Sequence, residues 1–366
     1  MRVLHLCPDY PYTALYGHLI GKLSDHIDNI VYIQQSELPL KATYPIVYLG
    51  RDFGFFDRLL FFRKQYCVIN DIKHRKLTEN IEVIHAHTLF SSGYEAYKLK
   101  KEYGVPYVVA VRNTDVNVFF HYMPHLRHIG VKVMLSASAV IFLSPAYQNQ
   151  VIKQYVPPRL RDIIRKKSYV IPNGIDDFYL NNTPDGLKKN DNKSVSIIYV
   201  GEISHNKNLP STLKACYILK NRGYQIKYRV VGKILDSDLN ALSQDPIVEY
   251  HNYCDKSEII NYYRESDVFV MPSLTETFGL VYAEALSQGL PIIYSKGQGI
   301  DGYFEEGYVG YHVVSKNAEE IANSIEQIIA DLHNMSERAI LASRRFNWSD
   351  IALEYVGLYK LILNNK

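Results

Sequence analysis

The sequence has few cysteines and no long apolar run, and each absence excludes a class of protein. Its four cysteines, Cys7, Cys67, Cys216 and Cys254, are scattered through 366 residues and form no Cys-x-x-Cys pair. This spacing argues against a disulfide framework or a zinc site and is typical of reduced thiols in a cytoplasmic protein. No run of about 18 apolar residues occurs, so no transmembrane helix is predicted.

The residues at the start of the sequence and the absence of repeats argue against two further classes. The segment MRVLHLCPDYPY enters a short apolar run at once and lacks the long apolar core and small-residue cleavage site of a signal peptide. No short-period repeat appears, which argues against a solenoid. A chain of this length, 47% hydrophobic and 22% charged, can bury the cores of two or three domains.

Charge is distributed unevenly along the chain. Residues 1–172 contain 22 Lys and Arg against 13 Asp and Glu, a net charge of +9, whereas residues 173–366 contain 19 against 25, a net charge of −6. This split suggests two lobes with different partners, of which the first meets something anionic. Solvated helices and chance are the alternative explanation.

Short apolar runs alternate with helical patterns in two successive series. Their nearly continuous apolar character predicts parallel sheets covered on both faces. We therefore predict an α/β protein with two Rossmann-like, doubly wound lobes, 1–172 and 173–347, which face each other across a cleft. A C-terminal helix, 348–366, is expected to pack back towards the first lobe. The predicted strands are 3–6, 30–33, 46–49, 83–87, 107–111 and 140–143, then 196–201, 228–232, 247–253, 268–273 and 291–295.

The most informative segment is SLTETFGLVYAEALSQGLP, residues 273–291. It predicts a loop after a strand and then a helix. Glu276 then lies at the carboxyl end of a parallel strand, Gly279 at the helix start and Glu284 about two turns into the helix. Free amides favour phosphate and carboxylates accept hydrogen bonds from hydroxyls, so a nucleotide-sugar fits this segment. Two glutamates without a ligand are the alternative.

Two other segments suit the same ligand. In YVGEISHNK a strand ends at Gly201, and Lys207 follows where an ammonium group can meet a diphosphate and stabilise a leaving group. A solvated loop lysine is the alternative. The segment VIPNGID, residues 170–176, predicts a tight turn at Asn173-Gly174 near the lobe boundary.

Together these segments resemble the retaining glycosyltransferases of family 4, which have the GT-B fold. The resemblance covers essentially the whole chain and depends most on the E-x7-E signature, here Glu276–Glu284, with PNGID and the VG…K element that ends in Lys207. It implies that the second lobe binds a UDP- or GDP-sugar and that the first lobe binds the acceptor. It implies no metal and no cofactor.

The resemblance also implies roles for individual residues. Glu276 would bind the transferred sugar and, with Lys207 at the diphosphate, form the catalytic centre. The implied donor-binding residues are Glu284 at the ribose, the amides around Phe278 and Gly279 at the diphosphate, the backbone near Tyr253 and Cys254 at the base, and also Gly201 and Thr277.

Three segments depart from the family's pattern. Glu202 stands where an arginine usually follows the glycine of the VG…K element. VRNTD replaces a His-Gly-x-Asp segment, and its arginine could grip phosphate or an acidic acceptor. LYGH replaces a Gly-Gly loop. The candidate acceptor-side residues are therefore Gly17, His87, Arg112, Asn113 and Asp115.

Other histidine and basic segments leave alternatives open. His85 and His87 end a predicted strand, where packing or substrate contact is more expected than catalysis. The segment RDFGFFDRLLFFRKQY, 51–66, interleaves Phe and Leu with basic residues. It suits an interfacial helix or a lipid-carrier contact, and also a core helix with basic edges. We expect a cytoplasmic protein that can touch the inner face of the membrane, without a nucleic-acid partner.

The predicted activity is retaining, metal-independent transfer of a sugar from a nucleoside diphosphate sugar to an acceptor hydroxyl, in surface-glycan or polysaccharide biosynthesis. A glycosidase that uses the two carboxylates is a weaker alternative. A nucleotide-sugar epimerase on the same fold is another. Glu202 and Arg112 also leave open a sugar-nucleotide-binding protein with weakened catalysis.

Overall fold

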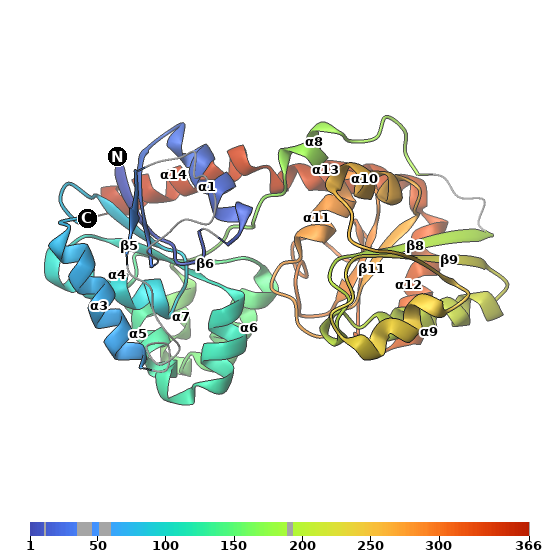
Figure 1. Cartoon of the computed structure of the whole chain (residues 1–366), viewed down its shortest axis with the longest axis horizontal. Helices are drawn as coiled ribbons and strands as arrows, with labels where there is room; N and C mark the ends of the chain where they lie inside the picture. Colours follow the sequence, from blue (N-terminus) through green and yellow to red (C-terminus); the bar gives the residue numbers. More distant parts are fainter. Residues whose placement is uncertain (11, 35–45, 51–59, 189–192, 366) are drawn as a thin grey trace. The chain divides into compact units, whose positions relative to one another are not determined.

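The computed structural model forms two compact units, each built on one parallel sheet (Figure 1). The structure describes residues 1–10, 12–34, 46–50, 60–188 and 193–365. Unit 1 comprises Met1–Leu143, Gln148–Gly174 and Trp348–Lys366, and unit 2 comprises Ser144–Tyr147 and Ile175–Asn347. The predicted boundary after residue 172 lies beside the division at Gly174.

Unit 1 has a seven-stranded sheet of order β3-β2-β1-β4-β5-β6-β7, with each neighbouring pair parallel. The chain starts in the middle and winds first to one edge and then to the other, which is the doubly wound arrangement predicted from the apolar runs. The strands are β1 (Arg2–Leu6), β2 (Asp28–Ile33), β3 (Ile46–Leu49), β4 (Val83–Ala86), β5 (Tyr107–Val111), β6 (Ala139–Phe142) and β7 (Ser168–Val170).

Helices cover both faces of this sheet. On one face α3 (Phe61–His74), α4 (Ser91–Tyr103) and α5 (Arg127–Ser136) lie side by side, and on the other α1 (Ala14–Ser24) packs against α14 (Trp348–Asn364) (Figure 1). Two more helices follow β6, α6 (Pro145–Tyr155) and α7 (Arg161–Arg165). Of the predicted interfacial segment 51–66, residues 51–59 lie outside the described residues and the last six begin α3.

The C-terminal helix α14 belongs to the core of unit 1, where Trp348, Tyr355 and Tyr359 are buried against the sheet. Trp348 also explains the glycine of PNGID, because a Cβ atom on Gly174 would lie 2.5 Å from the indole ring. The tight turn predicted at Asn173-Gly174 is wrong, since residues 171–176 form no turn. Close approach to the indole, and not a chain reversal, requires glycine here.

Unit 2 has a six-stranded parallel sheet of order β10-β9-β8-β11-β12-β13. Each of the five predicted runs forms a strand. The sixth was not predicted, because it is an edge strand whose two central residues are only partly buried and it lacks a continuous apolar run. The strands are β8 (Ser194–Val200), β9 (Gln225–Val231), β10 (Val248–His251), β11 (Val268–Met271), β12 (Ile292–Ser295) and β13 (Gly310–Val313).

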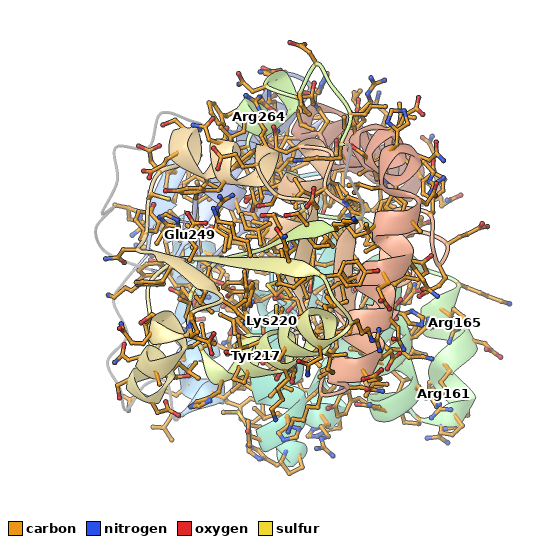
Figure 2. The ribbon with its side chains drawn as sticks, turned by 90° about the vertical axis from the view of Figure 1, so that its right-hand side faces the viewer. Arg161, Arg165, Tyr217, Lys220, Glu249 and Arg264 are labelled. Atoms are coloured by element: carbon orange, nitrogen blue, oxygen red, sulfur yellow. The ribbon has the colours of Figure 1, made fainter. Side chains whose placement is uncertain are left out.

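The helices of unit 2 also lie on both faces of the sheet (Figure 1). They are α8 (Asp177–Asn181), α9 (Leu209–Asn221), α10 (Lys256–Arg264), α11 (Leu280–Ser287), α12 (Ala318–Ala330) and α13 (Leu332–Ser343). Helix α9 packs against α12 and presents Tyr217 and Lys220 on its outer side (Figure 2). The two Rossmann-like sheets predicted from the sequence are thus confirmed.

Short helical turns complete the structure: a π helix η1 (Asp115–Phe120), and 3-10 helices η2 (Pro124–Leu126), η3 (Pro158–Leu160), η4 (His205–Lys207), η5 (Ser237–Gln244) and η6 (Arg344–Phe346). The four cysteines are free thiols. Within the described ranges, no helix is both long and apolar enough to span a bilayer.

Candidate active site

Lys207 and Glu276 meet at the carboxyl edge of the unit 2 sheet. Lys207 ends η4 after β8 and Glu276 lies in the loop after β11, so the pairing of β8 with β11 joins two residues 69 positions apart. Lys207 Nζ donates a 2.6 Å hydrogen bond to Glu276 Oε2, and the two side chains are 23% and 12% exposed. This pair can serve the phosphate and the hydroxyl groups of one ligand at the usual ligand-binding edge of a parallel sheet.

Two neighbouring loops hold Glu276 in place. Asn206 Oδ1 accepts a hydrogen bond from Thr275 N at 3.0 Å and so latches η4 to the loop after β11. From the loop after β12, Gln298 Oε1 accepts from Glu276 N at 3.0 Å, and Gly299 N donates to the Glu276 carbonyl oxygen at 2.6 Å. Since its backbone is bound at both polar atoms, Glu276 presents its carboxylate from a fixed position.

The start of α11 supplies backbone amides beside Glu276. Gly279 is the N-cap residue with a φ of +77°, and no side chain caps the helix. A Cβ atom at 279 would lie 2.6 Å from the Tyr282 ring and 3.3 Å from Glu276 Cγ, so only glycine permits this approach. Phe278 and Thr277 are buried, at 2% and 5% exposure, so their side chains are not available to a ligand, and the Thr277 N–H group already donates to Glu276 Oε1 at 3.1 Å. Free amides at a helix start favour phosphate.

Glu284 lies farther along α11. Because the helix begins at Leu280, Glu284 is its fifth residue, and the position predicted two turns into the helix is wrong. Burial raises the pKa of Glu284 to about 7, and Tyr263 Oη donates a long 3.4 Å hydrogen bond to its Oε2 atom. No hydrogen bond in the described part of the chain joins Glu284 to Glu276 or Lys207. Its carboxyl group keeps capacity to accept hydrogen bonds from hydroxyls.

Gly201 directly follows β8, at a point where two backbones approach closely. A Cβ atom on Gly232, at the end of the neighbouring β9, would lie 1.9 Å from the Gly201 carbonyl oxygen. Both glycines have positive φ angles, +141° and +147°. The side chain of Glu202, the next residue, is exposed, so this edge carries an acid where the family resemblance leads us to expect a cation.

Tyr253 and Cys254 follow β10, the edge strand of unit 2. Tyr253 is 78% exposed, whereas Cys254 is partly buried and burial raises the pKa of its thiol. Because every strand of the sheet is parallel, both residues lie at the same carboxyl edge as Gly201 and Lys207. No hydrogen bond or ion pair among the described residues joins them to the Lys207–Glu276 pair.

Arg112 follows β5 in unit 1 and is buried, with 8% exposure. Its Nη1 atom donates to Asn173 Oδ1 at 3.0 Å, and its guanidinium carbon lies 5.6 Å from the centroid of the Tyr16 ring. Asn113, the next residue, is exposed and accepts a hydrogen bond from Asn117 Nδ2 at 2.7 Å. A cation and an amide thus stand together at the carboxyl edge of the unit 1 sheet.

Asp115 has a mainly structural environment. It is 1% exposed and accepts hydrogen bonds from the backbone N–H groups of Leu89, Phe90 and Arg112 at 2.8–3.1 Å. Burial raises its pKa to about 6. These bonds fix the loops after β4 and β5, so Asp115 shapes this edge through the backbone.

Gly17 lies inside a helix and not in a loop. Helix α1 begins at Ala14, after Thr13 caps it by accepting a hydrogen bond from Leu15 N at 3.3 Å. A Cβ atom on Gly17 would meet nothing within 4 Å. Packing therefore does not require glycine at this position.

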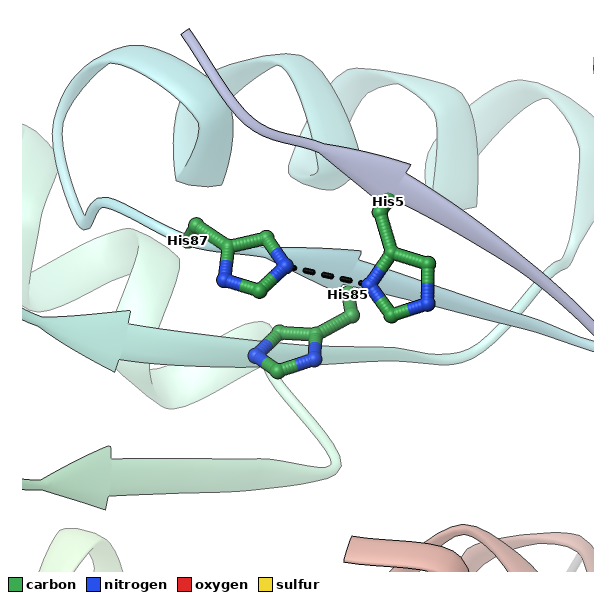
Figure 3. A group of neighbouring side chains, drawn as sticks. All are labelled: His5, His85 and His87. Atoms are coloured by element: carbon green, nitrogen blue, oxygen red, sulfur yellow. Dashed lines mark hydrogen bonds between the residues drawn. The ribbon is translucent and has the colours of Figure 1, made fainter. Parts of the chain in front are cut away.

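Three buried histidines meet on β1 and at the end of β4: His5, His85 and His87 (Figure 3). His5 lies opposite His85 in the sheet, and one ring nitrogen of each lies within 4.8 Å of the others, a spacing that a metal ion could bridge. His5 Nδ1 and His87 Nε2 instead share a 3.0 Å hydrogen bond, and His85 Nδ1 bonds Tyr359 Oη at 2.7 Å. Burial lowers the pKa of all three imidazoles. These contacts describe a neutral hydrogen-bonded cluster, and the expectation of no metal stays a prediction.

Sequence reasoning missed Asn206, Gln298 and His5. Gln298 stands between two glycines with positive φ, so a Gly-x-Gly loop after a predicted strand could have indicated it. Asn206 directly precedes Lys207 in a polar loop, which is a weak signal. His5 gave none, because a single histidine in an apolar strand is typical of a protein core.

Comparison with known proteins divides the chain between two family models. The model described as Glycosyltransferase Family 4 matches residues 22–177, and the model described as Glycosyl transferases group 1 matches residues 184–346. The first match covers most of unit 1, and the second covers most of unit 2.

Individual proteins are similar over most of the chain. D-inositol 3-phosphate glycosyltransferase of Arthrobacter sp. (strain FB24) is 24% identical over 78% of this chain and 71% of its own. Alpha-monoglucosyldiacylglycerol synthase of Acholeplasma laidlawii is 27% identical over 84% and 81% of the two chains. The crystal structure of Anabaena Alr3699/HepE in complex with UDP has a TM-score of 0.71 and 17% identity over 98% of this chain and 99% of that chain, which shows a common fold. The chain therefore belongs to glycosyltransferase family 4 and has the GT-B fold.

Proposed function

We propose that this glycosyltransferase moves a hexose-type sugar from a nucleoside diphosphate sugar to an acceptor hydroxyl with retention of configuration. The Lys207–Glu276 pair carries the proposal, because it places a cation for phosphate within one hydrogen bond of an acceptor for sugar hydroxyls. The UDP bound to the Anabaena protein supports a UDP-sugar donor, with a GDP-sugar as the alternative.

The donor must separate this ion pair. Diphosphate oxygens replace Glu276 as the partner of Lys207 Nζ, and hydroxyls of the sugar then donate to the released carboxylate. In an oxocarbenium-like transition state, negative charge grows on the leaving phosphate, so Lys207 and the amides at the start of α11 stabilise the transition state more than the ground state. A leaving phosphate oxygen takes the acceptor's proton on the same face, which gives retention without a separate base.

The remaining donor contacts follow the carboxyl edge of unit 2. Glu284 is the proposed partner of the ribose hydroxyls, and the backbone near Tyr253 and Cys254 is the proposed contact of the base. Gly201 lets the backbone approach the diphosphate closely. Because Lys207 and the helix-start amides supply the positive charge, the proposed reaction needs no metal.

The acceptor is proposed to bind unit 1 and to belong to glycolipid or surface-polysaccharide biosynthesis. The name of one relative specifies D-inositol 3-phosphate, and the name of the other specifies a monoglucosyldiacylglycerol as the compound that it makes. Arg112 is suited to the anionic group of an acceptor such as an inositol phosphate, and the exposed Asn113 is suited to its hydroxyls.

Contact with the inner face of the membrane is proposed through the α3–α4 surface. The α3–α4 surface is the set of residues that line a pocket of about 540 Å³ on these two helices: Phe62, Tyr66, Ile69, Asn70, Lys73, Tyr94, Lys98, Lys101 and Glu102. Phe62 and Tyr66 are 53% and 67% exposed. Exposed aromatic rings beside lysines suit the interface of an anionic bilayer.

The experiment that tests the donor site is a thermal-shift screen with UDP, GDP, ADP and CDP on the wild type and on Lys207→Met. A ligand that binds the native state raises the apparent stability by mass action, so the nucleotide of the donor should give the largest shift. That shift should be lost in Lys207→Met. A nucleotide shift of equal size in both proteins would overturn the proposed diphosphate contact.

Product analysis then separates the alternative functions. The sugar nucleotide that binds best is incubated alone, with acceptors, and with acceptors plus a metal chelator. An isomer formed without acceptor supports the epimerase, and binding without turnover across the acceptors supports a catalytically weakened binding protein. Sugar transfer that continues in the presence of the chelator, with the anomeric configuration retained, supports the proposed reaction.

A further inference from the structure

A chain of hydrogen bonds runs through unit 1 from α1 to the end of β4. Ser24 Oγ donates to the Ile20 carbonyl oxygen at 2.9 Å, and Asn29 Nδ2 donates to Ser24 Oγ at 3.0 Å. His5 Nε2 lies 2.7 Å from Asn29 Oδ1, and His5 Nδ1 lies 3.0 Å from His87 Nε2 (Figure 3). The amide and both imidazoles are buried, so bulk water does not compete for these bonds.

Two backbone carbonyl groups fix the direction of this chain. A carbonyl oxygen can only accept, so the hydroxyl proton of Ser24 is committed to the Ile20 carbonyl. Asn29 Nδ2 also lies 3.4 Å from the Ile27 carbonyl oxygen, which identifies it as the donor end of the amide. Asn29 Oδ1 is therefore the acceptor end, and it accepts the proton of His5 Nε2.

Each neutral imidazole carries one ring proton. Burial lowers the pKa of His5 to about 4 and lowers the pKa of His87 as well, so both rings are neutral near pH 7. With its proton on Nε2, His5 has a bare Nδ1 atom, which accepts the Nε2 proton of His87. His87 Nδ1 is left with a lone pair, and this buried atom has no partner among the described residues.

Arg112 presents the complementary atom. Its Nε atom lies 3.4 Å from the His87 carbonyl oxygen. The Tyr16 ring contacts both residues, with its centroid 5.1 Å from that of the His87 ring and 5.6 Å from the guanidinium carbon. In the described structure Arg112 Nη2 is also buried without a hydrogen-bond partner, although the guanidinium lies near the Tyr355 hydroxyl, whose pKa is raised by burial and lowered, to a smaller extent, by the guanidinium. A lone pair and an N–H group that are both buried without a partner each carry a desolvation cost, and pairing them, directly or through one internal water, would remove it.

We propose that Ser24, Asn29 and His5 form a relay that locks His87 in the Nε2–H tautomer, so that its Nδ1 atom holds Arg112 Nη2. Asn29 and His5 are then positioning residues for the arginine.

The relay also preserves the charge of Arg112. A carboxylate in the place of His87 would orient the guanidinium but would also neutralise it, whereas a neutral lone pair orients it and leaves its charge for a ligand. Two acids lie near Arg112. Asp115 is already occupied by three backbone N–H groups, and Asp9 interacts with the guanidinium through charge, which lowers the pKa of its carboxyl against the larger raising effect of burial. The relay therefore suits an acceptor that carries a phosphate or carboxylate group, a step that rests on the proposed role of unit 1 as the acceptor side.

The tautomer is tested by nitrogen-15 NMR of the full-length protein at about pH 7.5, with the His87 signals identified by their loss in His87→Asn. The Nε2–H form is expected for both His5 and His87. Asn29→Asp gives His5 a carboxylate partner, which favours protonation of both its ring nitrogens. His5 Nδ1–H then donates to His87 Nε2 and moves the His87 proton to Nδ1. A wild-type His87 with its proton on Nδ1, or an unchanged tautomer in Asn29→Asp, would overturn the relay.

The effect on Arg112 is measured separately, with inorganic phosphate as the probe. Saturating UDP occupies the donor site of unit 2, and phosphate is then titrated while the guanidinium signals assigned by Arg112→Gln are followed. The phosphate Kd should rise about tenfold in His87→Leu and in Asn29→Asp. It should change by less than about twofold in His87→Asn, whose amide oxygen can replace Nδ1 as the acceptor.

The UDP thermal shift is the folding control for each variant, because the donor site lies in unit 2. Equal phosphate binding by the wild type and Arg112→Gln would show that Arg112 is not the anion site, while the tautomer measurement still decides the relay. Phosphate binding that needs Arg112 but is equal in His87→Leu and the wild type would show that the relay does not position the arginine.

Discussion

Lys207 Nζ and Glu276 Oε2 lie 2.6 Å apart at the carboxyl edge of unit 2, although 69 positions separate them in the sequence. Both side chains are more than three-quarters buried, so their charges attract each other more strongly than those of an exposed pair. Removal of one charge leaves the other partly desolvated and unpaired. Variants that keep shape and change one property at a time are therefore the informative ones.

Lys207→Met keeps the length of the side chain and removes its charge. We expect kcat to fall by about 100- to 1,000-fold, because the leaving phosphate loses its nearest cation in the transition state. Lys207→Arg keeps the charge, so its kcat should fall less than that of Lys207→Met. Nucleoside diphosphate release in the presence of acceptor measures the rate, and circular dichroism checks the fold. A kcat for Lys207→Met within about threefold of wild type would remove this residue from the catalytic centre.

Glu284 should make stability depend on pH. Burial raises its pKa from 4.5 to about 7, so the folded protein binds this proton more tightly than the unfolded chain does. The stabilisation is fully present below about pH 4.5 and is lost as the pH rises through 7. Glu284→Gln stays neutral at every pH, so its unfolding free energy should not show this decrease between about pH 4.5 and pH 8. At about pH 8 its unfolding free energy should exceed that of the wild type by about 1–3 kcal/mol. Urea denaturation between about pH 5 and pH 8 measures both curves, and parallel curves would contradict the raised pKa.

The sheets and the nearness of Lys207 to Glu276 were predictable because their signals are local. Each buried parallel strand is a nearly continuous apolar run, and the polar residues that follow such runs lie at one edge of the sheet. That rule was enough to place Lys207 and Glu276 in one neighbourhood. The edge strand β13 carries a weaker pattern because it is only half covered.

The contacts that depend on long-range packing were not predictable. The sequence around Gly174 resembles a turn, and only the position of Trp348 shows why a side chain is excluded there. His5 is an ordinary strand residue until the register of β1 with β4 places it opposite His85. In both cases the decisive partner is distant in the sequence, and neither composition nor spacing identifies it.

Two glycine substitutions test the packing of unit 1. Gly174→Ala should destabilise the protein by at least about 1–3 kcal/mol, because its Cβ atom would lie 2.5 Å from the Trp348 ring. Gly17→Ala is the matched control, since that Cβ atom meets nothing within 4 Å and lies inside α1. It should stabilise by about 0.5–1 kcal/mol. Thermal or urea unfolding measures both, and a Gly174→Ala protein as stable as the wild type would contradict the described contact with Trp348.

The α3–α4 surface should bind vesicles that contain anionic lipid. Lys98 Nζ lies 5.4 Å from the centroid of the Tyr94 ring, which itself lies 5.9 Å from that of Phe62, so cationic and aromatic groups form one continuous face. Each lysine near an anionic surface contributes about 1 kcal/mol of attraction. We therefore expect the double variant Lys98→Glu with Lys101→Glu to bind at least about tenfold more weakly in vesicle sedimentation.

Lys214→Glu with Lys220→Glu is the matched control for this surface, because it makes the same change in net charge on the exposed side of α9 in unit 2, where Lys220 Nζ lies 6.0 Å from the Tyr217 ring centroid (Figure 2). It should bind the same vesicles as tightly as the wild type. Added salt should weaken wild-type binding because it screens the lysines, and Phe62→Ser should weaken binding at every salt concentration because it removes apolar contact. Equal losses in this α9 double variant and in the Lys98→Glu, Lys101→Glu variant would show that net charge, and not the α3–α4 surface, governs binding. If the wild type bound neutral vesicles as tightly as anionic ones, the lysines would play no part in binding.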